Sequence, residues 1–213
     1  MHTEILTPAQ LAVLSRLKGS AVASPFYLAG GTALALRHGH RRSIDFDFFR
    51  PGPFDQRALL SSLSARFEAL ELLTSGTDTL YVRVDGVTLS CFRLRYPLLE
   101  PEEASPWGFG IAGDRDLAAM KLEAVAARGS RKDFVDLHLL CHAGLTLEDV
   151  FVAFEAKYGT VLADRYHRLR ALAYFDDAER EPVPDMLVHH DWEAVTRFFQ
   201  AEAGRLLAAG LAG

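Results

Sequence analysis

Two aspartates near the start of the chain have the spacing of a metal-binding pair. Asp45 and Asp47 stand one residue apart in an apolar and aromatic run that ends at Phe49. If this run is a β-strand, side chains alternate between its two faces, so both carboxylates project from the same face. Two neighbouring carboxylates repel each other unless a cation lies between them, and Mg²⁺ prefers a few carboxylates together with phosphate oxygens. We therefore predict a metal site for Mg²⁺, or alternatively Mn²⁺, at Asp45 and Asp47; the competing interpretation is a strand with an acidic outer face.

A Gly-Gly-Thr sequence precedes the aspartates and points to phosphate binding. Glycine has no side chain, so Gly30 and Gly31 let the backbone approach phosphates closely. A Gly-Gly pair alone is usually only a turn, so its weight comes from its position ahead of the acids. Taken together, residues 30–32 and the two aspartates predict a nucleotide-phosphate and metal site.

Basic residues lie between the glycines and the aspartates. They form either a solvated loop or a set of phosphate contacts, because a triphosphate requires donors that neutralise its charge. A metal site at the two histidines is disfavoured, since no cysteine or third histidine supports one. The cluster consists of Arg37, His38, His40, Arg41 and Arg42.

A second group of charged residues lies in the second half of the chain. Lys121 stands among apolar residues of a helical pattern, where an isolated lysine usually extends along the surface to water. Lys132, Asp133 and Asp136 follow after a break at Gly129, and the two aspartates, three residues apart, share one helical face. On residue types alone, these three are either surface charges or part of a site.

The elements that must position these residues change character along the chain. Branched and aromatic runs predict strands at residues 26–29, 43–49, 68–74, 79–84 and 87–94, and Asp85-Gly86 predicts a tight hairpin between the last two. Apolar periodicity predicts helices at residues 8–17, 32–38, 54–69, 114–128, 132–142, 146–158 and 191–207. The fold class is therefore α+β, with a mixed sheet and helices first and a helical region second.

Composition narrows the class of protein. The 213 residues are 49% hydrophobic and 24% charged, which is ordinary for a globular protein. The net charge of -5 requires any nucleic-acid partner to meet a local basic patch. The sequence has no signal-peptide pattern and no apolar run long enough to span a membrane, and Cys91 and Cys141 lie in apolar surroundings. We therefore expect a cytoplasmic protein without a membrane partner.

Three blocks of sequence together resemble the AbiEii-type nucleotidyltransferase toxin family, within the DNA polymerase beta-like nucleotidyltransferase superfamily. The blocks are YLAGGTALAL, HRRSIDFDFF and KLEAVAARGSRKDFVDLHLL. The resemblance implies a nucleotidyltransferase-like mixed sheet with flanking helices over residues 1–112. It also implies a helical C-terminal region, over residues 113–213, that packs on this core.

The resemblance also implies a role for each matching residue. The expected catalytic residues are Asp45, Asp47, Lys121 and Asp136, and Asp133 belongs to the same helical motif as Asp136. The expected nucleotide-binding residues are Gly30, Gly31, Thr32, Arg42, Ser43 and Lys132. The implied function is Mg²⁺-dependent transfer of a nucleoside monophosphate from a nucleoside triphosphate to an acceptor such as the tRNA 3′ end. The chain would act as the toxin of a bacterial toxin–antitoxin system and have a cognate antitoxin protein.

Two alternative functions remain open because of one departure from the superfamily pattern. Superfamily enzymes often carry a third carboxylate on a later strand, but the run VTLSCFRL has no acid and places Ser90 near that position. This departure is compatible with a module that binds a nucleotide without catalysing its transfer and that acts through contacts with a partner. A transferase for a small-molecule acceptor is the other alternative, since no motif specifies the acceptor.

Two weaker patterns occur near the C-terminus. His189, His190 and Asp191 have the types of a metal triad, but Asp191 is better explained as a helix cap preceded by loop histidines. Residues 165–170, with three arginines, Tyr166 and His167, suggest a basic helical face. That face either follows an RNA backbone or balances nearby acids.

Overall fold

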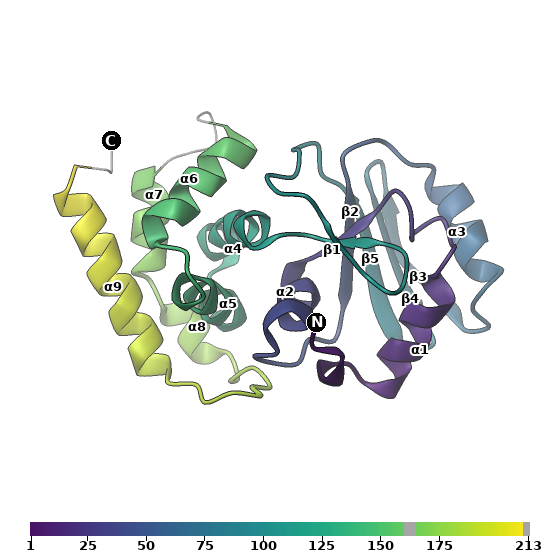
Figure 1. Cartoon of the computed structure of the whole chain (residues 1–213), viewed down its shortest axis with the longest axis horizontal. Helices are drawn as coiled ribbons and strands as arrows, with labels where there is room; N and C mark the ends of the chain where they lie inside the picture. Colours follow the sequence, from purple (N-terminus) through teal and green to yellow (C-terminus); the bar gives the residue numbers. More distant parts are fainter. Residues whose placement is uncertain (160–164, 211–213) are drawn as a thin grey trace. The chain divides into compact units, whose positions relative to one another are not determined.

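The computed structural model describes residues 1–159 and 165–210, and it confirms the predicted α+β class (Figure 1). The remaining residues of the predicted helical region, 160–164 and 211–213, lie outside the described residues. The chain divides into two compact units, Met1–Gly113 and Asp114–Gly213. The first contains the mixed sheet and the second is helical.

The first unit is built on a sheet of seven strands in the order β3-β4-β5-β2-β1-β7-β6. Strand β1 pairs with β7 and β2 pairs with β5 in parallel, and the other neighbouring strands are antiparallel. The strands are β1 (Tyr27–Ala29), β2 (Phe46–Arg50), β3 (Leu70–Gly76), β4 (Thr79–Val84), β5 (Val87–Arg93), β6 (Glu103–Ala104) and β7 (Gly110–Ile111). The helices are η1 (Thr3–Ile5), α1 (Pro8–Leu17), α2 (Gly30–His38) and α3 (Gln56–Ser64).

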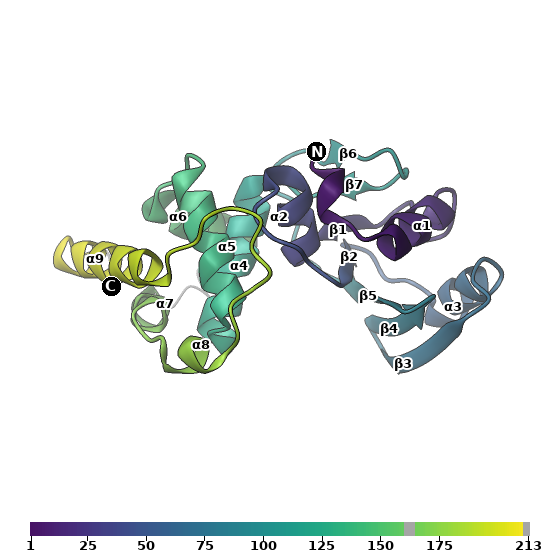
Figure 2. The ribbon, with the colours of Figure 1, turned by 90° about the horizontal axis from the view of Figure 1, so that it is seen from below.

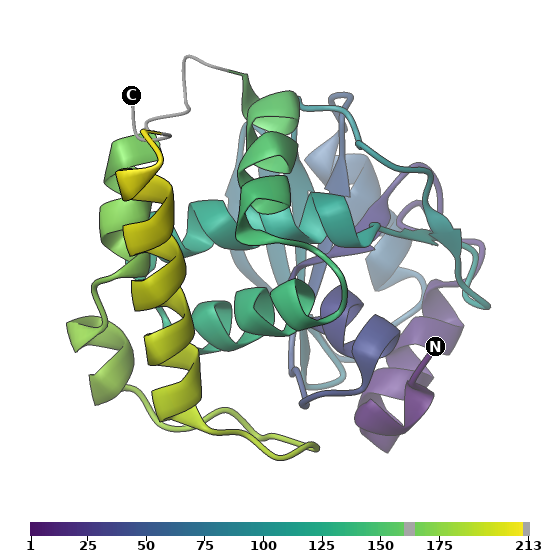
Figure 3. The ribbon, with the colours of Figure 1, turned by 60° about the vertical axis from the view of Figure 1, so that its left-hand side comes forward.

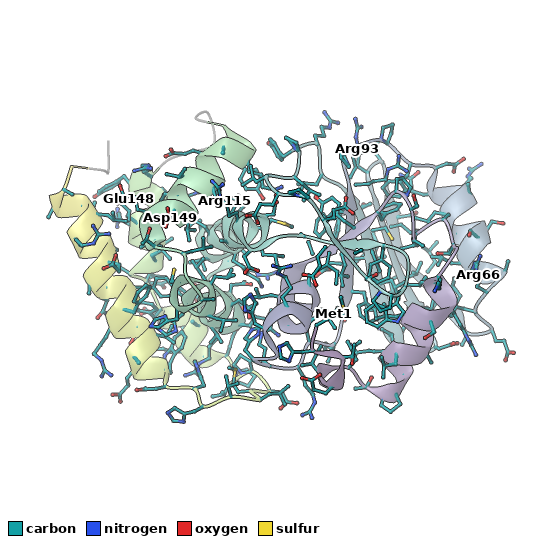
Figure 4. The ribbon with its side chains drawn as sticks, in the orientation of Figure 1. Met1, Arg66, Arg93, Arg115, Glu148 and Asp149 are labelled. Carbon is teal, nitrogen blue, oxygen red and sulfur yellow. The ribbon has the colours of Figure 1, made fainter. Side chains whose placement is uncertain are left out.

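Helices of the first unit pack against specific strands. Helix α1 contacts β5, α2 contacts β1 and β2, and α3 contacts β3 (Figure 2). Helix α1 begins at a capping box, in which Thr7 and Gln10 bond to each other's backbone N–H groups. At its other end, Arg66 donates to the carbonyls of Arg16, Lys18 and Gly19, which have no donor within the helix (Figure 4).

The predicted hairpin joins β4 and β5. Asp85 and Gly86 both have positive φ angles, 46° and 82°, as a two-residue turn with the right-handed strand twist requires. On the outer side of β4, β3 forms the edge of the sheet and is exposed along most of its length. Its pairing with β4 is interrupted by a bulge between Leu72 and Thr74.

The boundaries of two predicted elements in the first unit need the largest corrections. Strand β2 begins at Phe46 rather than at residue 43, because the preceding segment is held by bonds to Gln10 and Thr32 instead of a ladder. Helix α3 ends at Ser64 rather than at residue 69, since Arg66 turns toward α1. Strands β6 and β7 were not predicted, because two residues are too few to show an alternating pattern.

The second unit is organised around α4, which contacts α5, α6 and α7. Helix α9 contacts both α5 and α7 and appears in yellow in Figure 3. An aromatic cluster formed by Phe134, Phe175, Trp192 and Phe199 joins α5 to α9 and to the start of α8. The helices are α4 (Asp114–Arg128), α5 (Arg131–His142), α6 (Leu147–Tyr158), α7 (Arg165–Leu172), α8 (Asp176–Arg180) and α9 (Trp192–Ala208).

The sequence placed most of these helices to within one residue. Thr146 caps α6 and Asp191 caps α9, where the Asp191 carboxylate accepts from the backbone of Glu193 and Ala194. The cap interpretation of Asp191 is therefore confirmed. Helix α8 was not predicted, because five residues give too short a periodic pattern.

No single helix among residues 1–159 and 165–210 has both the length and the apolar composition needed to cross a membrane. Helices α5 and α6 reach that composition only when taken together, and they are bent by 110° at the break between them.

Two glycine substitutions should have opposite effects on stability. Gly86→Ala should lower the free energy of unfolding by roughly 1–2 kcal/mol, because alanine is strained at a positive φ. Gly204→Ala should raise it by roughly 0.5–1 kcal/mol, since Gly204 lies in α9 with open space around it. Urea unfolding of both variants measures the difference, and equal effects would contradict the assigned turn.

Candidate active site

The chain passes directly from β1 into α2 at Gly30, beside Asp47. Gly30 has a φ of +69°, and a Cβ placed on it would lie 2.6 Å from Oδ2 of Asp47. A side chain at this position would therefore collide with the carboxylate as well as strain the backbone. The glycine lets the start of α2 lie directly against Asp47.

The absence of a side chain at Gly31 leaves room for the guanidinium group of Arg41. A Cβ on Gly31 would lie 2.5 Å from Nη2 of Arg41 and 3.1 Å from the hydroxyl of Ser43. Arg41 is buried, and its Nη1 donates to the carbonyl of Arg42 at 2.9 Å. The two glycines thus seat a carboxylate and a guanidinium next to consecutive residues of the backbone.

The start of α2 suits an anion. Thr7 and Asp55 cap α1 and α3 with their side chains, but Ala29 precedes α2 and offers no capping oxygen. The first N–H groups of a helix have no partner within it, and the helix dipole makes this end partially positive. Phosphates bind at such helix starts. The Gly-Gly sequence thus belongs to the first turn of α2, instead of forming the separate turn that the sequence suggested.

Thr32 connects α2 to the acidic segment. Its buried hydroxyl donates to the backbone carbonyl of Asp45 at 2.5 Å. Gln10 of α1 holds the same segment by donating to the carbonyl of Ser43 at 2.7 Å. These two bonds fix the chain on the approach to β2, so Asp45 is positioned by side chains of α1 and α2 and not by strand pairing.

Asp47 lies inside β2, opposite Ala29 of β1 and Ser90 of β5. The residues on either side of it, Phe46 and Phe48, are fully buried, whereas both aspartates are partly exposed. Alternation along the strand therefore separates the carboxylate of Asp47 from the two rings. Burial raises the pKa of the Cys91 thiol on β5 to about 12, and the charge of Asp47 adds to this rise.

Strand β5 has a hydroxyl at the position where superfamily enzymes often carry a third carboxylate. Ser90 is buried and lies directly opposite Asp47, and no residue of β5 is acidic. In residues 1–159 and 165–210, no group of three histidine, cysteine, aspartate or glutamate side chains has the arrangement of a metal site.

The basic residues ahead of Asp45 are not a uniformly solvated loop. His40 and Arg41 are buried, whereas Arg42 is exposed and Ser43 is partly exposed. Arg37 forms an ion pair with Glu103 at 2.5 Å. The burial of these residues therefore differs from one to the next, and the exposed Arg42 is close in sequence to both aspartates.

In the second unit, the structure brings Lys121, Asp133 and Asp136 together. The ammonium group of Lys121 lies 2.9 Å from Oδ1 of Asp133 and 2.6 Å from Oδ2 of Asp136. Lys121 is only 5% exposed, so it does not extend along the surface to water. Asp133 and Asp136 are fully buried, so the interpretation as surface charges is wrong for these two aspartates. Lys132, in contrast, is exposed and has no ion pair with this cluster among the described residues.

Arg128 completes the cluster through a two-pronged bond to Asp133. Its Nε and Nη2 donate to the two carboxylate oxygens at 2.7 and 3.0 Å. Burial by itself would raise the pKa of Asp133, but Lys121 and Arg128 outweigh burial and hold this pKa below its ordinary value. Asp133 therefore remains charged in the interior and orients both cations.

A second buried ion pair was not predicted. Lys157 of α6 lies 2.7 Å from Asp116 of α4, and both side chains are fully buried. Arg168 of α7 also pairs with Glu123 of α4 at 2.7 Å. The pairing of Arg168 agrees with the interpretation that residues 165–170 balance nearby acids. The sequence gives no sign of the Lys157–Asp116 pair, because the two residues are distant along the chain and stand in ordinary helical patterns.

Neutralising Asp133 should strongly destabilise the protein. Asp133→Asn leaves Lys121 and Arg128 without their shared carboxylate and should cost about 3–5 kcal/mol in the free energy of unfolding. Because the pKa of Asp133 is lowered in the folded state, its contribution is complete above about pH 4 and is lost as the pH falls through the lower, folded-state pKa.

Urea unfolding between pH 7 and pH 3 measures both effects. Glu193→Gln is the control, since it removes an exposed carboxylate paired with Arg197 and should change stability by less than about 0.5 kcal/mol. If both variants were equally stable, the buried cluster would not have the proposed energetic importance.

Comparison with known proteins assigns the chain to a protein family. The family model described as "Nucleotidyl transferase AbiEii toxin, Type IV TA system" matches residues 12–102 and 115–205. An uncharacterized protein of Aquifex aeolicus (strain VF5), aq_aa25, is 39% identical over 202 residues, which cover 93% of this chain and 96% of that protein.

Two solved structures have a similar fold. MenT4, the nucleotidyltransferase toxin Rv2826c from Mycobacterium tuberculosis H37Rv, is 20% identical with a TM-score of 0.57, over 92% of this chain and 84% of that one. A candidate nucleotidyltransferase from H. pylori is 17% identical with a TM-score of 0.52, over 93% of this chain and 91% of that one. At these identities the likenesses establish the fold, and the family model supplies the enzyme class: the chain belongs to the AbiEii nucleotidyl transferase toxin family.

Proposed function

We propose that the chain transfers a nucleoside monophosphate from a nucleoside triphosphate to an acceptor hydroxyl, with the 3′ end of tRNA as the acceptor. The observation that carries this proposal is the packing at Gly30 and Gly31, which seat the Asp47 carboxylate and the Arg41 guanidinium against the start of α2. Nucleotidyl transfer requires carboxylates for a divalent metal and backbone donors for phosphates in one place.

The phosphates would be held by donors of the first unit. The backbone N–H groups of Gly30, Gly31 and Thr32 lie in the first turn of α2, which is suited to an anion. Arg42 is exposed and Ser43 is partly exposed, so both side chains are accessible to a ligand. We assign these five residues to the phosphate groups of the nucleotide.

Asp45 and Asp47 would hold the divalent metal, Mg²⁺ or Mn²⁺. Their donors are carboxylate oxygens, which hard cations prefer, and a bound triphosphate would complete the coordination that two carboxylates begin. A Cβ at residue 30 would fill the space beside Oδ2 of Asp47, and the glycine keeps that space open. When bound, the metal would offset the charge that develops on the transferred phosphoryl group.

The reaction is an in-line displacement at the α-phosphorus. The acceptor oxygen forms a bond to phosphorus while the bond to the bridging oxygen breaks, and pyrophosphate leaves with the electron pair. Because β5 has no acid opposite Asp47, we assign the proton of the acceptor hydroxyl to water. The protein residues thus act by holding the reactants and their charges in position.

Lys121, Asp136 and Lys132 take supporting parts in this proposal. The ammonium of Lys121 would neutralise phosphate charge, and its bonds to Asp133 and Asp136 restrict it to one orientation. Asp136, being paired with Lys121 at 2.6 Å, is a positioning residue in this scheme instead of a base. Lys132 is exposed and would contact the nucleotide as a mobile cation.

The biological setting follows from the family. Its members are described as toxins of type IV toxin–antitoxin systems, so we propose a cognate antitoxin protein for this chain as well. We place the reaction in the cytoplasm. The unpaired cysteines Cys91 and Cys141 support a reducing compartment.

A second candidate function is nucleotide binding without turnover. The observation that favours it is Ser90, which occupies the position opposite Asp47 where a third carboxylate would complete the acidic set. Transfer to a small-molecule acceptor is a third candidate. It uses the same nucleotide site, so the three candidate functions differ in where the labelled nucleotide is transferred, which the following experiment measures.

Replacing Asp47 should abolish transfer. With each of four α-labelled nucleoside triphosphates, Mg²⁺ and total bacterial RNA, wild-type protein should place label on a tRNA-sized band. Asp47→Asn and Asp45→Asn should each lower the rate by more than about 100-fold, because several kcal/mol of charge stabilisation are lost. Replacing Mg²⁺ with excess chelator should have the same effect.

Glu71→Gln is the matched control, since Glu71 is an exposed carboxylate paired with Arg83 on the same sheet. It should retain the wild-type rate. Full activity of Asp47→Asn would refute the proposed site. Mg²⁺-dependent nucleotide binding without pyrophosphate release would favour the binding module, and label on a small molecule would favour the third candidate.

A further inference from the structure

The second unit contains a hollow that the proposed nucleotide site does not use. It has a volume of about 630 Å³ and is lined by residues of the last turn of α4, of helix α7 and of the start of α8. This volume is within the range of about 300–1,000 Å³ that is usual for ligand-binding pockets. The residues of its lining that carry the inference are Arg128, Tyr166, His167, Arg170, Tyr174 and Asp177.

Two tyrosine rings line the hollow and are exposed to solvent. Tyr166 is 52% exposed and Tyr174 is 49% exposed, although aromatic rings contribute most to stability when they are buried. Several phenylalanines and Trp192 of the same unit form a closed cluster instead. Exposed rings that share one hollow are the arrangement on which unstacked nucleobases pack.

The arginines of α7 separate into two groups. Arg165 pairs with Glu155 and Arg168 pairs with Glu123, so these two arginines balance nearby acids. Arg170 differs, because it takes part in no ion pair among the described residues and its guanidinium lies 5.8 Å from the ring centre of Tyr166. It therefore presents a positive charge beside an exposed ring, where a phosphate and its base would lie.

The end of α4 and the start of α8 supply positive charge and hydrogen-bond acceptors to the hollow. The side chain of Arg128 is 56% exposed even though it holds Asp133. The carbonyl of Val125 accepts from the N–H of Gly129, whereas the carbonyls that follow it in the last turn of α4 have no donor within the helix. These carbonyls and the carboxylate of Asp177 are acceptors for the amino groups of bases. The hollow thus combines ring faces, cations and acceptors, and each of these matches one part of a nucleotide.

We propose that this hollow binds a single-stranded segment of the RNA acceptor, with bases against Tyr166 and Tyr174 and phosphodiesters against Arg170 and Arg128. The proposal rests on the proposed function for the identity of the acceptor. A phosphodiester has one negative charge, which one arginine matches, whereas a free triphosphate would need more cations than this lining offers. The net charge of -5 requires such a local patch for any RNA to bind.

Binding of a fluorescently labelled RNA oligonucleotide to the full chain, without nucleoside triphosphate, tests the proposal by anisotropy. The probe is a single strand of about eight nucleotides. Tyr166→Ala should weaken binding by about 5- to 150-fold, the effect of losing one base stack, whereas Tyr166→Phe should retain binding because it keeps the ring. Arg170→Gln should weaken binding and reduce the slope of log affinity against log salt by about 1.

Arg197→Gln is the matched control, because it removes another exposed arginine, which lies on α9. It should bind RNA like wild type. Equal affinity of all variants, or no RNA binding by wild type, would overturn the proposal. Competition by a mononucleotide as strong as that by the oligonucleotide would also overturn it, since the hollow would then take a single nucleotide.

Nucleotide binding, measured separately with Mg²⁺, distinguishes this proposal from the proposed function. Asp47→Asn should lose nucleotide affinity and retain RNA affinity, and the Tyr166 and Arg170 variants should show the reverse. Intact nucleotide binding without RNA binding refutes the RNA-binding proposal for the hollow and leaves the proposed function standing. If the protein binds RNA in a manner that depends on Tyr166 but binds no nucleotide, the RNA-binding proposal for the hollow is supported and the proposed function is refuted.

Discussion

The close approach between the Gly30 backbone and the Asp47 carboxylate fixes how the chain passes from β1 into α2. Strands β1 and β2 pair so that Ala29 faces Asp47, and the helix begins at the next residue. A side chain there would have to displace either the helix or the carboxylate. Because the junction is closed, Thr32 reaches the carbonyl of Asp45, and the acidic segment enters β2 in one defined path. The geometry of the candidate site is thus a consequence of backbone packing.

The second unit relies on a different interaction, the pairing of charges inside a helical core. Removing Lys121, Asp133 and Asp136 from water is costly, and such clusters are often no more stable than apolar residues of the same size. Their benefit is orientation, since an ammonium group held by two carboxylates has little freedom. Lys157 and Asp116 repeat this arrangement between α4 and α6. Charged pairs therefore fix the relative positions of the helices around α4.

Local patterns predicted much of the fold because local physics governs those elements. Capping residues such as Thr7, Thr146 and Asp191, and the Asp85-Gly86 turn, act on their immediate neighbours. The strand near Asp45 was placed three residues too early, because its start is set by bonds to residues of other helices. The burial of Lys121 and the pairing of Lys157 with Asp116 depend on helix packing, which residue types do not encode. The register that puts Ser90 opposite Asp47 is likewise a tertiary result.

The bulge in β3 has a consequence for association between molecules. An edge strand exposes a row of backbone donors and acceptors, and Leu72 and Leu73 add apolar surface to this one. Such an edge would ordinarily recruit strands of other copies and lead to fibrous assemblies. The irregular register between Leu72 and Thr74 interrupts the row in its middle, so an incoming strand finds no continuous ladder. The defect in the sheet therefore protects the protein from growing by strand addition.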